Sequence, residues 1–196
     1  MQNRRGEMVK RMLYTGQRFY ELKVCGLTRR LPVIQIAENL WIASFVMLGD
    51  AQLVNVCAGA LATRLAEADF DIMLGPEAKV VPLLQSIATL LGHQRYVVCR
   101  KSVKAYMQDP LVVEVESITT KGKQKLVLDG VDVQRVKGKR VAVVDDVVST
   151  GGTLEAVEAL VKQAGGEVVC RAAVLKEGDQ PFEGLIFLET LPVFTR

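Results

Sequence analysis

The sequence predicts an α/β protein with a mainly parallel sheet flanked by helices. Apolar segments of strand length alternate with helix-forming segments through the middle of the chain. Residues 141–144 are continuously apolar, as expected of a strand buried on both faces of a parallel sheet. Residues 154–160 follow at once and favour a helix. With 196 residues, 49% of them hydrophobic, a single domain (1–196) is expected.

Periodicity and turn residues assign the other elements. Apolar residues at i, i+3 and i+4 spacing predict a helix over 51–68. Pro82 fits the first turn of a helix over 80–91, where a missing N–H costs no helical bond. Gly75-Pro76 is expected to stop a strand, and Gly165-Gly166 to cap a helix. The expected strands or extended segments are 31–37, 40–48, 71–74, 95–99, 111–119, 125–128, 141–144, 167–175 and 185–188, with a hairpin around 121–123.

The most informative segment is 141–153, which reads Val-Ala-Val-Val-Asp-Asp-Val-Val-Ser-Thr-Gly-Gly-Thr. Asp145 and Asp146 follow the buried strand, at the end where ligands collect in open α/β sheets. Two acceptor-only carboxylates suit a ribose diol or a hydrated cation. Residues 149–153 supply hydroxyl and backbone N–H donors, and the helix that follows favours an anion at its N-terminus. The segment therefore predicts a sugar-phosphate site.

Two other interpretations compete with this one. A surface turn with a helix N-cap at Ser149, Thr150 or Thr153 would use the same residue types. The complete order of strand, acidic pair, small-residue turn and helix favours the binding site over that alternative. A P-loop nucleotide site requires a lysine after its second glycine, and none follows Gly152.

The segment resembles the phosphoribosyl-pyrophosphate (PRPP) signature of the type I phosphoribosyltransferases. In that family the acidic pair holds the ribose hydroxyls and the following loop holds the 5′-phosphate. The resemblance implies Mg²⁺ as the cofactor, bridging diphosphate and sugar hydroxyls. Asp145 and Asp146 would contact it through water, with no direct metal ligand from the protein. The residues assigned to PRPP are Asp145, Asp146, Val147, Val148, Ser149, Thr150, Gly151, Gly152 and Thr153.

A second candidate loop is Glu77-Ala78-Lys79, between an expected strand and an expected helix. Backbone N–H groups, a helix N-terminus and a lysine could hold an anion, although a plain connecting turn uses the same elements. In the resembled family the equivalent loop holds pyrophosphate. Many relatives carry an arginine-glycine pair where this chain has Lys79-Val80, and Glu77-Ala78 is closer to xanthine phosphoribosyltransferase-type loops.

A third candidate begins with Arg100-Lys101, at the end of the strand over 95–99. A mobile cover could exclude water here while its cations neutralise a leaving diphosphate. The alternative is a solvated run of charges. The pair resembles that of adenine and xanthine phosphoribosyltransferases, which implies catalytic roles for Arg100 and Lys101 alongside Asp145 and Asp146. Lys104 and Tyr106 are further candidates in the same segment.

The resemblance implies a purine phosphoribosyltransferase, a pentosyltransferase that moves the phosphoribosyl group from PRPP to a purine and releases pyrophosphate. Ser149 stands where hypoxanthine–guanine enzymes have an aspartate, which favours the adenine/xanthine group. By the same resemblance, residues 1–49 form an N-terminal arm and hood, 50–175 the core, and 176–196 a tail completing both. Trp41 and Phe45 are apolar candidates for the hood.

Charge keeps a second functional class open. Residues 1–30 hold eight Lys/Arg and two Glu, a net charge of +6 in a chain whose total is +3. A basic arm of this kind could serve a non-catalytic PRPP-sensing regulator that binds nucleic acid. No helix-turn-helix or aromatic RNA motif accompanies it, so nucleic acid is the minor alternative. A homodimer is expected because members of the resembled family are usually dimers.

The remaining composition fits a cytoplasmic protein. Cys25, Cys57, Cys99 and Cys170 are widely scattered, which predicts reduced and mostly buried thiols rather than a disulfide framework or zinc site. The N-terminus shows no secretory signal. No apolar run is long enough to cross a bilayer, so no membrane partner is expected.

Overall fold

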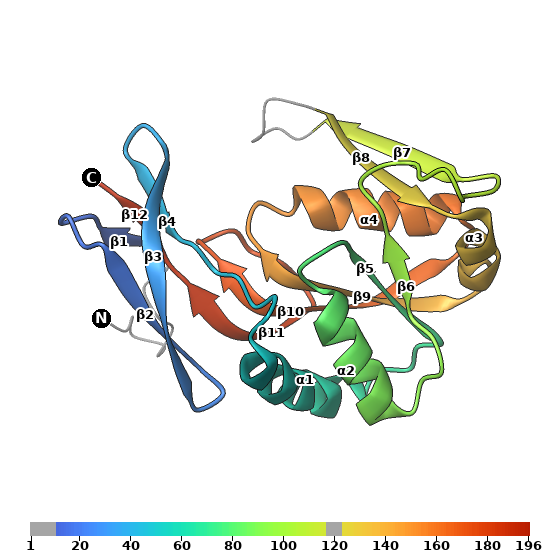
Figure 1. The fold of residues 1–196 in the computed structure, drawn as a ribbon, viewed down its shortest axis with the longest axis horizontal. Helices are drawn as coiled ribbons and strands as arrows, with labels where there is room; N and C mark the ends of the chain where they lie inside the picture. Colours follow the sequence, from blue (N-terminus) through green and yellow to red (C-terminus); the bar gives the residue numbers. More distant parts are fainter. Residues whose placement is uncertain (1–10, 117–122) are drawn as a thin grey trace.

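The computed structural model describes residues 11–116 and 123–196, which form two five-stranded sheets, a β-hairpin and four helices (Figure 1). The core sheet has the order β11-β10-β9-β5-β6, and every neighbouring pair in it is parallel. Its strands are β5 (Ile72–Pro76), β6 (Val97–Cys99), β9 (Arg140–Val148), β10 (Glu167–Glu177) and β11 (Leu185–Leu191). The parallel α/β core predicted from sequence is confirmed.

Helices cover both faces of the core sheet, and β9 shows why. Ala142 and Val144 of β9 pack with side chains of α1 (Ala51–Leu65) and α2 (Val81–Leu91). Val141 and Val143 point the other way and pack with α4 (Gly152–Gln163) and with the short α3 (Gly130–Val136). Strand side chains alternate between faces, so a continuously apolar strand is buried on both. In Figure 1, α4 lies on one side of the sheet and α1 and α2 on the other.

The second sheet, which we call the hood, combines both ends of the described chain. Its order is β1-β12-β4-β3-β2, and β12 follows β11 of the core sheet after one residue. Phe194 of β12 pairs with Trp41 of β4, and Tyr14 stacks on Trp41 with ring centroids 4.1 Å apart. The strands are β1 (Arg11–Leu13), β2 (Phe19–Val24), β3 (Leu27–Ala37), β4 (Leu40–Ala43) and β12 (Val193–Thr195).

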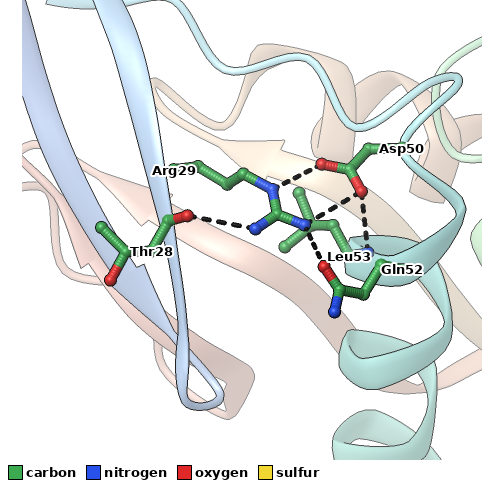
Figure 2. Close-up of polar contacts among 5 residues, drawn as sticks. All are labelled: Thr28, Arg29, Asp50, Gln52 and Leu53. Atoms are coloured by element: carbon green, nitrogen blue, oxygen red, sulfur yellow. Dashed lines mark hydrogen bonds and ion pairs between the residues drawn. The ribbon is translucent and has the colours of Figure 1, made fainter.

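Arg29 of β3 ties the hood to the core (Figure 2). Its Nε lies 2.6 Å from Oδ2 of Asp50, and its Nη2 donates to Oδ1 of Asp50 at 3.1 Å and to Oε1 of Gln52 at 2.9 Å. Asp50 also caps α1 by accepting the Leu53 N–H at 3.0 Å. The guanidinium holds the pKa of the Asp50 carboxyl below its usual value, with help from the Leu53 N–H. One carboxylate thus serves both the helix N-terminus and the hood.

The hairpin of β7 (Leu111–Glu116) and β8 (Lys123–Leu128) packs against the α4 side of the core. Val113, Leu126 and Leu128 are buried there. Arg100 and Val127 exchange both backbone hydrogen bonds at 2.8 Å, which fixes the end of β6 beside β8. The expected hairpin is confirmed in its two strands, whereas residues 117–122 of its turn lie outside the described part of the chain.

Several expected boundaries were wrong. Residues 44–48 are not strand, so the extended segment expected at 40–48 ends with β4. Gly75-Pro76 does not stop its strand, because β5 continues to pair with β6 through Pro76. The signature strand runs on to Val148 and contains the acidic pair. Four elements were not expected from the sequence: β1, β2, α3 and β12.

Gly75 shows how tightly β5, β9 and α2 meet. A Cβ at this position would lie 2.4 Å from the carbonyl oxygen of Val144 and 3.0 Å from side-chain atoms of Leu84 and Val80. Only glycine allows that approach. Residues 77–79 closely follow Gly75, and Asp145 and Asp146 directly follow Val144. The close contact between Gly75 and Val144 therefore brings the 77–79 loop near the acidic pair.

The described cysteines carry free thiols. Cys57, Cys99 and Cys170 are buried, and Cys25 is exposed in the β2–β3 turn. Burial raises the pKa of the Cys57 and Cys99 thiols to about 12, with smaller contributions from neighbouring charges. The prediction of mostly buried thiols is confirmed. Within the described residues, no helix has the length and apolar character needed to cross a membrane.

Candidate active site

A cavity of about 610 Å³ opens where the carboxyl ends of β5, β9 and β10 meet the hood. The sequence-predicted residues in its wall are Glu77, Ala78, Lys79, Lys101, Asp145, Asp146, Val147, Ser149 and Thr153. Three separately predicted segments therefore share one cavity. The other lining residues are Ile42, Ala43, Ser44, Phe45, Pro76, Val80, Lys125, Leu126, Glu177 and Leu191.

The structure places the remaining predicted site residues around this cavity rather than in its wall. Arg100 lies beside Glu77, and Lys104 donates from Nζ to the Ser102 hydroxyl at 2.7 Å. Tyr106 is 66% exposed. Val148 is buried on the opposite face of β9. Thr150, Gly151 and Gly152 complete the turn between β9 and α4.

The acidic pair is held rigidly within β9. The Asp146 N–H donates to Oδ1 of Asp145 at 2.8 Å. Burial raises the pKa of the Asp145 carboxyl well above its usual value, and the nearby charge of Asp146 raises it further. Asp145 still keeps part of its surface open, while Asp146 is only 8% exposed.

Oδ2 of Asp146 is buried and has no hydrogen-bond partner among the described residues. Buried carboxylate oxygens normally have partners, so this one has an acceptor to offer a ligand at the cavity wall. A sugar hydroxyl or a metal-bound water would be a suitable donor. The orphaned oxygen therefore fits Mg²⁺ held through water. No group of three or more His, Cys, Asp or Glu that could hold a metal directly occurs in the described residues.

The turn before α4 is shaped for an anion. Gly151 has φ +89° and is the N-cap residue of α4, where its carbonyl accepts the Glu155 N–H at 2.9 Å and it has no side chain to cap the helix. The first N–H groups of a twelve-residue helix therefore face the side on which Ser149 and Thr153 line the cavity. A Cβ at Gly151 would lie 2.8 Å from the Phe182 ring, so glycine serves both the backbone conformation and the packing.

Glu77 connects its own loop, residues 77–79, to the Arg100-Lys101 segment. Its Oε1 accepts the Lys101 N–H at 2.7 Å, and its Oε2 lies 2.8 Å from Nε of Arg100 in an ion pair that lacks hydrogen-bond alignment. The Glu77 N–H donates to the Cys99 carbonyl at 2.9 Å, and the Glu77–Ala78 peptide bond is cis. The Arg100 side chain is thus directed to Glu77, whereas Lys79 and Lys101 line the cavity.

Sequence reasoning missed Glu177, a buried carboxyl in the cavity wall at the end of β10. Burial raises the pKa of Glu177, and a hydrogen bond with Ser149 and the charge of Lys79 partly offset that rise. Its position at a strand end was the available signal. Of the two hood candidates, Phe45 lines the cavity, whereas Trp41 is buried against Tyr14.

Comparison with known proteins decides the family. Residues 48–183 match the family described as "Phosphoribosyl transferase domain". The chain belongs to this family. A hypoxanthine/guanine phosphoribosyltransferase of Methanococcus voltae is 35% identical to it over 152 residues, which are 76% of each chain. An adenine phosphoribosyltransferase of Clostridium botulinum is 32% identical over 130 residues, 66% of this chain and 72% of that one.

Solved structures agree on the fold. An adenine phosphoribosyltransferase of Thermoanaerobacter pseudethanolicus superposes with a TM-score of 0.60 and 28% identity, covering 74% of this chain and 84% of that one. The enzyme of Rhodothermus marinus covers 89% and 94% with a TM-score of 0.61 and, at 24% identity, supports the fold alone. The resemblance to the type I phosphoribosyltransferases and their purine branch is confirmed, and the phosphoribosyltransferase is a pentosyltransferase.

Proposed function

We propose that this phosphoribosyltransferase transfers the 5-phosphoribosyl group from PRPP to a purine base and releases pyrophosphate, with a base preference like that of the adenine/xanthine group. The observation that carries the proposal is the shared cavity: the acidic pair, the 149–153 turn and two lysines face one space. No single segment supplies diol, phosphate and diphosphate contacts, but the three together do. The names of the relatives support a purine as the acceptor.

The proposed reaction is a displacement at the anomeric carbon of ribose. The purine nitrogen attacks, the bond to pyrophosphate breaks, and positive charge develops on the sugar ring. Asp145 and Asp146 accept hydrogen bonds from the ribose hydroxyls, which fixes the ring for attack. The 149–153 turn and the α4 N-terminus hold the 5′-phosphate. No covalent intermediate with the protein is needed.

Lys79 and Lys101 are proposed to neutralise the leaving diphosphate. Arg100 positions this segment through Glu77 rather than by direct contact with the cavity. When bound, Mg²⁺ would add positive charge to the diphosphate, held through water by Asp145 and Asp146. Val147 lines the same cavity and would pack beside the base.

Hypoxanthine or guanine is the second candidate acceptor, because the relative with 35% identity carries that name. Ser149 does not decide the matter by itself. We also propose that residues 50–175 provide the PRPP site, that the described part of residues 1–49 covers the base with the tail 176–196, and that the protein is a homodimer. Size-exclusion chromatography with light scattering tests the oligomeric state.

Three basic residues at the start of the described chain have partners within the protein. Arg11 lies 2.7 Å from Asp179, Arg29 pairs with Asp50, and the Arg30 guanidinium stacks 3.8 Å from the centroid of the Phe19 ring. These contacts use positive charge that a nucleic-acid regulator would present to its partner. They support the enzyme over the regulator.

An assay of pyrophosphate release tests the proposal. The protein is incubated with PRPP, MgCl₂ and one of adenine, guanine, hypoxanthine or xanthine, and pyrophosphate is measured by a coupled reaction. We expect release that depends on both PRPP and a base. Absence of release with every base, together with salt-sensitive binding to nucleic acid, would establish the regulator instead.

A further inference from the structure

The cavity is lined by two chemically different sets of residues. One set, from the 149–153 turn together with Lys79 and Lys101, suits phosphate and diphosphate. The other set is apolar and comprises Ile42 of the hood strand β4, Phe45 shortly after it, and Leu191 at the end of β11. A flat aromatic ring packs well on such a surface, and the few polar groups around it fix its orientation.

Glu177 is next to Leu191 of the apolar set and also interacts with Ser149 and Lys79 of the polar set. It pairs with Leu191 across the β10–β11 ladder, and the next residue, Gly178, donates its N–H to the Leu191 carbonyl at 2.9 Å. Leu191 is the last residue of β11, one residue before β12 of the hood. The backbone therefore holds Glu177 where the core sheet meets the hood.

The Glu177 carboxyl is costly at this place. The residue is only 8% exposed, and burial disfavours its ionised form. The Ser149 hydroxyl and the charge of Lys79 compensate in part. Lys79 also lines the cavity as one of the residues that suit diphosphate, and a bound diphosphate would compete for that cation. A donor on the second substrate would then satisfy Glu177.

We propose that Glu177 recognises the purine base by accepting a hydrogen bond from an exocyclic amino group of that base. A carboxylate accepts and does not donate, so it attracts an amino group and repels a carbonyl oxygen at the same ring position. The acceptor is accordingly an aminopurine: adenine in preference to hypoxanthine, or guanine in preference to xanthine. This inference rests on the proposed function and narrows it.

Steady-state kinetics with the four bases test the proposal in the wild-type protein. Each amino base and its oxo partner differ in the exocyclic group and in the adjacent ring nitrogen, which carries a proton only in the oxo base, so the ratio of their kcat/KM values tests which edge of the ring the protein prefers. We expect a ratio of about tenfold or more in at least one pair, as for hydrogen bonds to charged groups. Ratios near one in both pairs, or a preference for the oxo base, would overturn the proposal.

Variants identify the residue responsible. Glu177→Leu removes the acceptor and should bring the preferred ratio close to one, mainly through the KM of the amino base, while Glu177→Gln keeps one carbonyl and should retain part of it. Glu167→Gln, an exposed glutamate at the opposite end of β10, is the matched control and should behave like wild type. Circular dichroism and thermal denaturation show that each variant is folded, independently of any change in PRPP affinity.

The outcomes separate the proposal that Glu177 recognises the base from the proposed transferase function. If Glu177→Leu changes only the KM of PRPP, then Glu177 positions Lys79 and does not read the base, although the transferase proposal stands. An unchanged ratio in both variants would likewise show that Glu177 does not recognise the base. If the wild-type protein releases no pyrophosphate with any of the four bases, the proposed function fails and this inference fails with it.

Discussion

Oε1 of Glu77 accepts the backbone N–H of Lys101 at 2.7 Å. This hydrogen bond connects the loop after β5 to the segment after β6, two regions 24 residues apart in sequence. The second carboxylate oxygen lies 2.8 Å from Nε of Arg100. A single side chain thereby connects the segments that carry Lys79 and Lys101, both of which line the cavity.

Glu77→Ala should weaken PRPP binding without unfolding the protein. The variant removes the acceptor of the Lys101 N–H and the ion-pair partner of Arg100, so the segment that carries Lys101 loses two of the contacts that hold it in place. We expect the KM of PRPP to rise by about tenfold, with a smaller effect on the KM of the base. Glu183→Ala, an exposed glutamate, provides the control. Equal effects on both KM values would contradict the coupling.

Asp146→Asn should weaken PRPP binding strongly. The amide keeps one acceptor oxygen but places an NH₂ donor where the buried carboxylate has an unpaired oxygen. Loss of a hydrogen bond to a charged group costs about 1.5–3 kcal/mol, or roughly 10–150-fold in affinity. Titration calorimetry with PRPP and Mg²⁺ measures the loss, and circular dichroism checks the fold.

Asp109→Asn is a suitable control for that experiment. Asp109 is exposed and has φ +46°, a conformation that asparagine adopts as readily as aspartate. The Asp109→Asn substitution makes the same chemical change outside the cavity wall. Unchanged PRPP affinity in Asp146→Asn would show that the acidic pair does not hold the sugar.

The sequence indicated the core of the fold because its strands are buried on both faces. Residues 141–144 are apolar without interruption, and the structure shows all four buried. The strands of the hood gave a weaker signal. In β2 only Leu22 and Val24 are buried, and β12 has three residues whose extended form depends on pairing with β4 and β1. Tertiary pairing, which is not visible locally, decides such strands.

The candidate site divides in the same way. Asp145, Asp146 and the 149–153 turn lie within nine consecutive residues, so one short segment was enough to predict their chemistry. Glu177 and Phe45 are far from that segment in sequence and reach the cavity only through strand register and hood packing. Lys176-Glu177-Gly178 resembles an exposed charged turn, whereas the parallel ladder with β11 buries both charged residues.

Gly75→Ala should destabilise the protein, and Gly59→Ala should not. A Cβ at Gly75 meets the Val144 carbonyl at 2.4 Å, a backbone atom that cannot move aside without shifting β9. We expect a loss of about 1–3 kcal/mol, as for other overpacked sites. Gly59 lies inside α1 with nothing within 4 Å of its Cβ position, so alanine should stabilise the helix by about 0.5–1 kcal/mol. Chemical denaturation measures both values.

Binding of PRPP with Mg²⁺ should release a proton from Asp145. Burial and the charge of Asp146 raise the pKa of the Asp145 carboxyl in the free protein, whereas sugar hydroxyls or a hydrated cation favour its ionised form. Binding therefore lowers this pKa. The affinity for PRPP should rise with pH and should level off once the pH exceeds the raised pKa of the Asp145 carboxyl in the free protein.

Calorimetry in buffers of different ionisation enthalpy measures this proton release directly. PRPP itself carries titrating phosphates, so the proton count of the wild-type protein must be compared with that of Asp145→Asn at the same pH. The difference belongs to Asp145, because the variant keeps the shape of the side chain and cannot titrate. Equal proton release by the two proteins at every pH, with binding retained in both, would show that Asp145 does not lose a proton when the ligand binds.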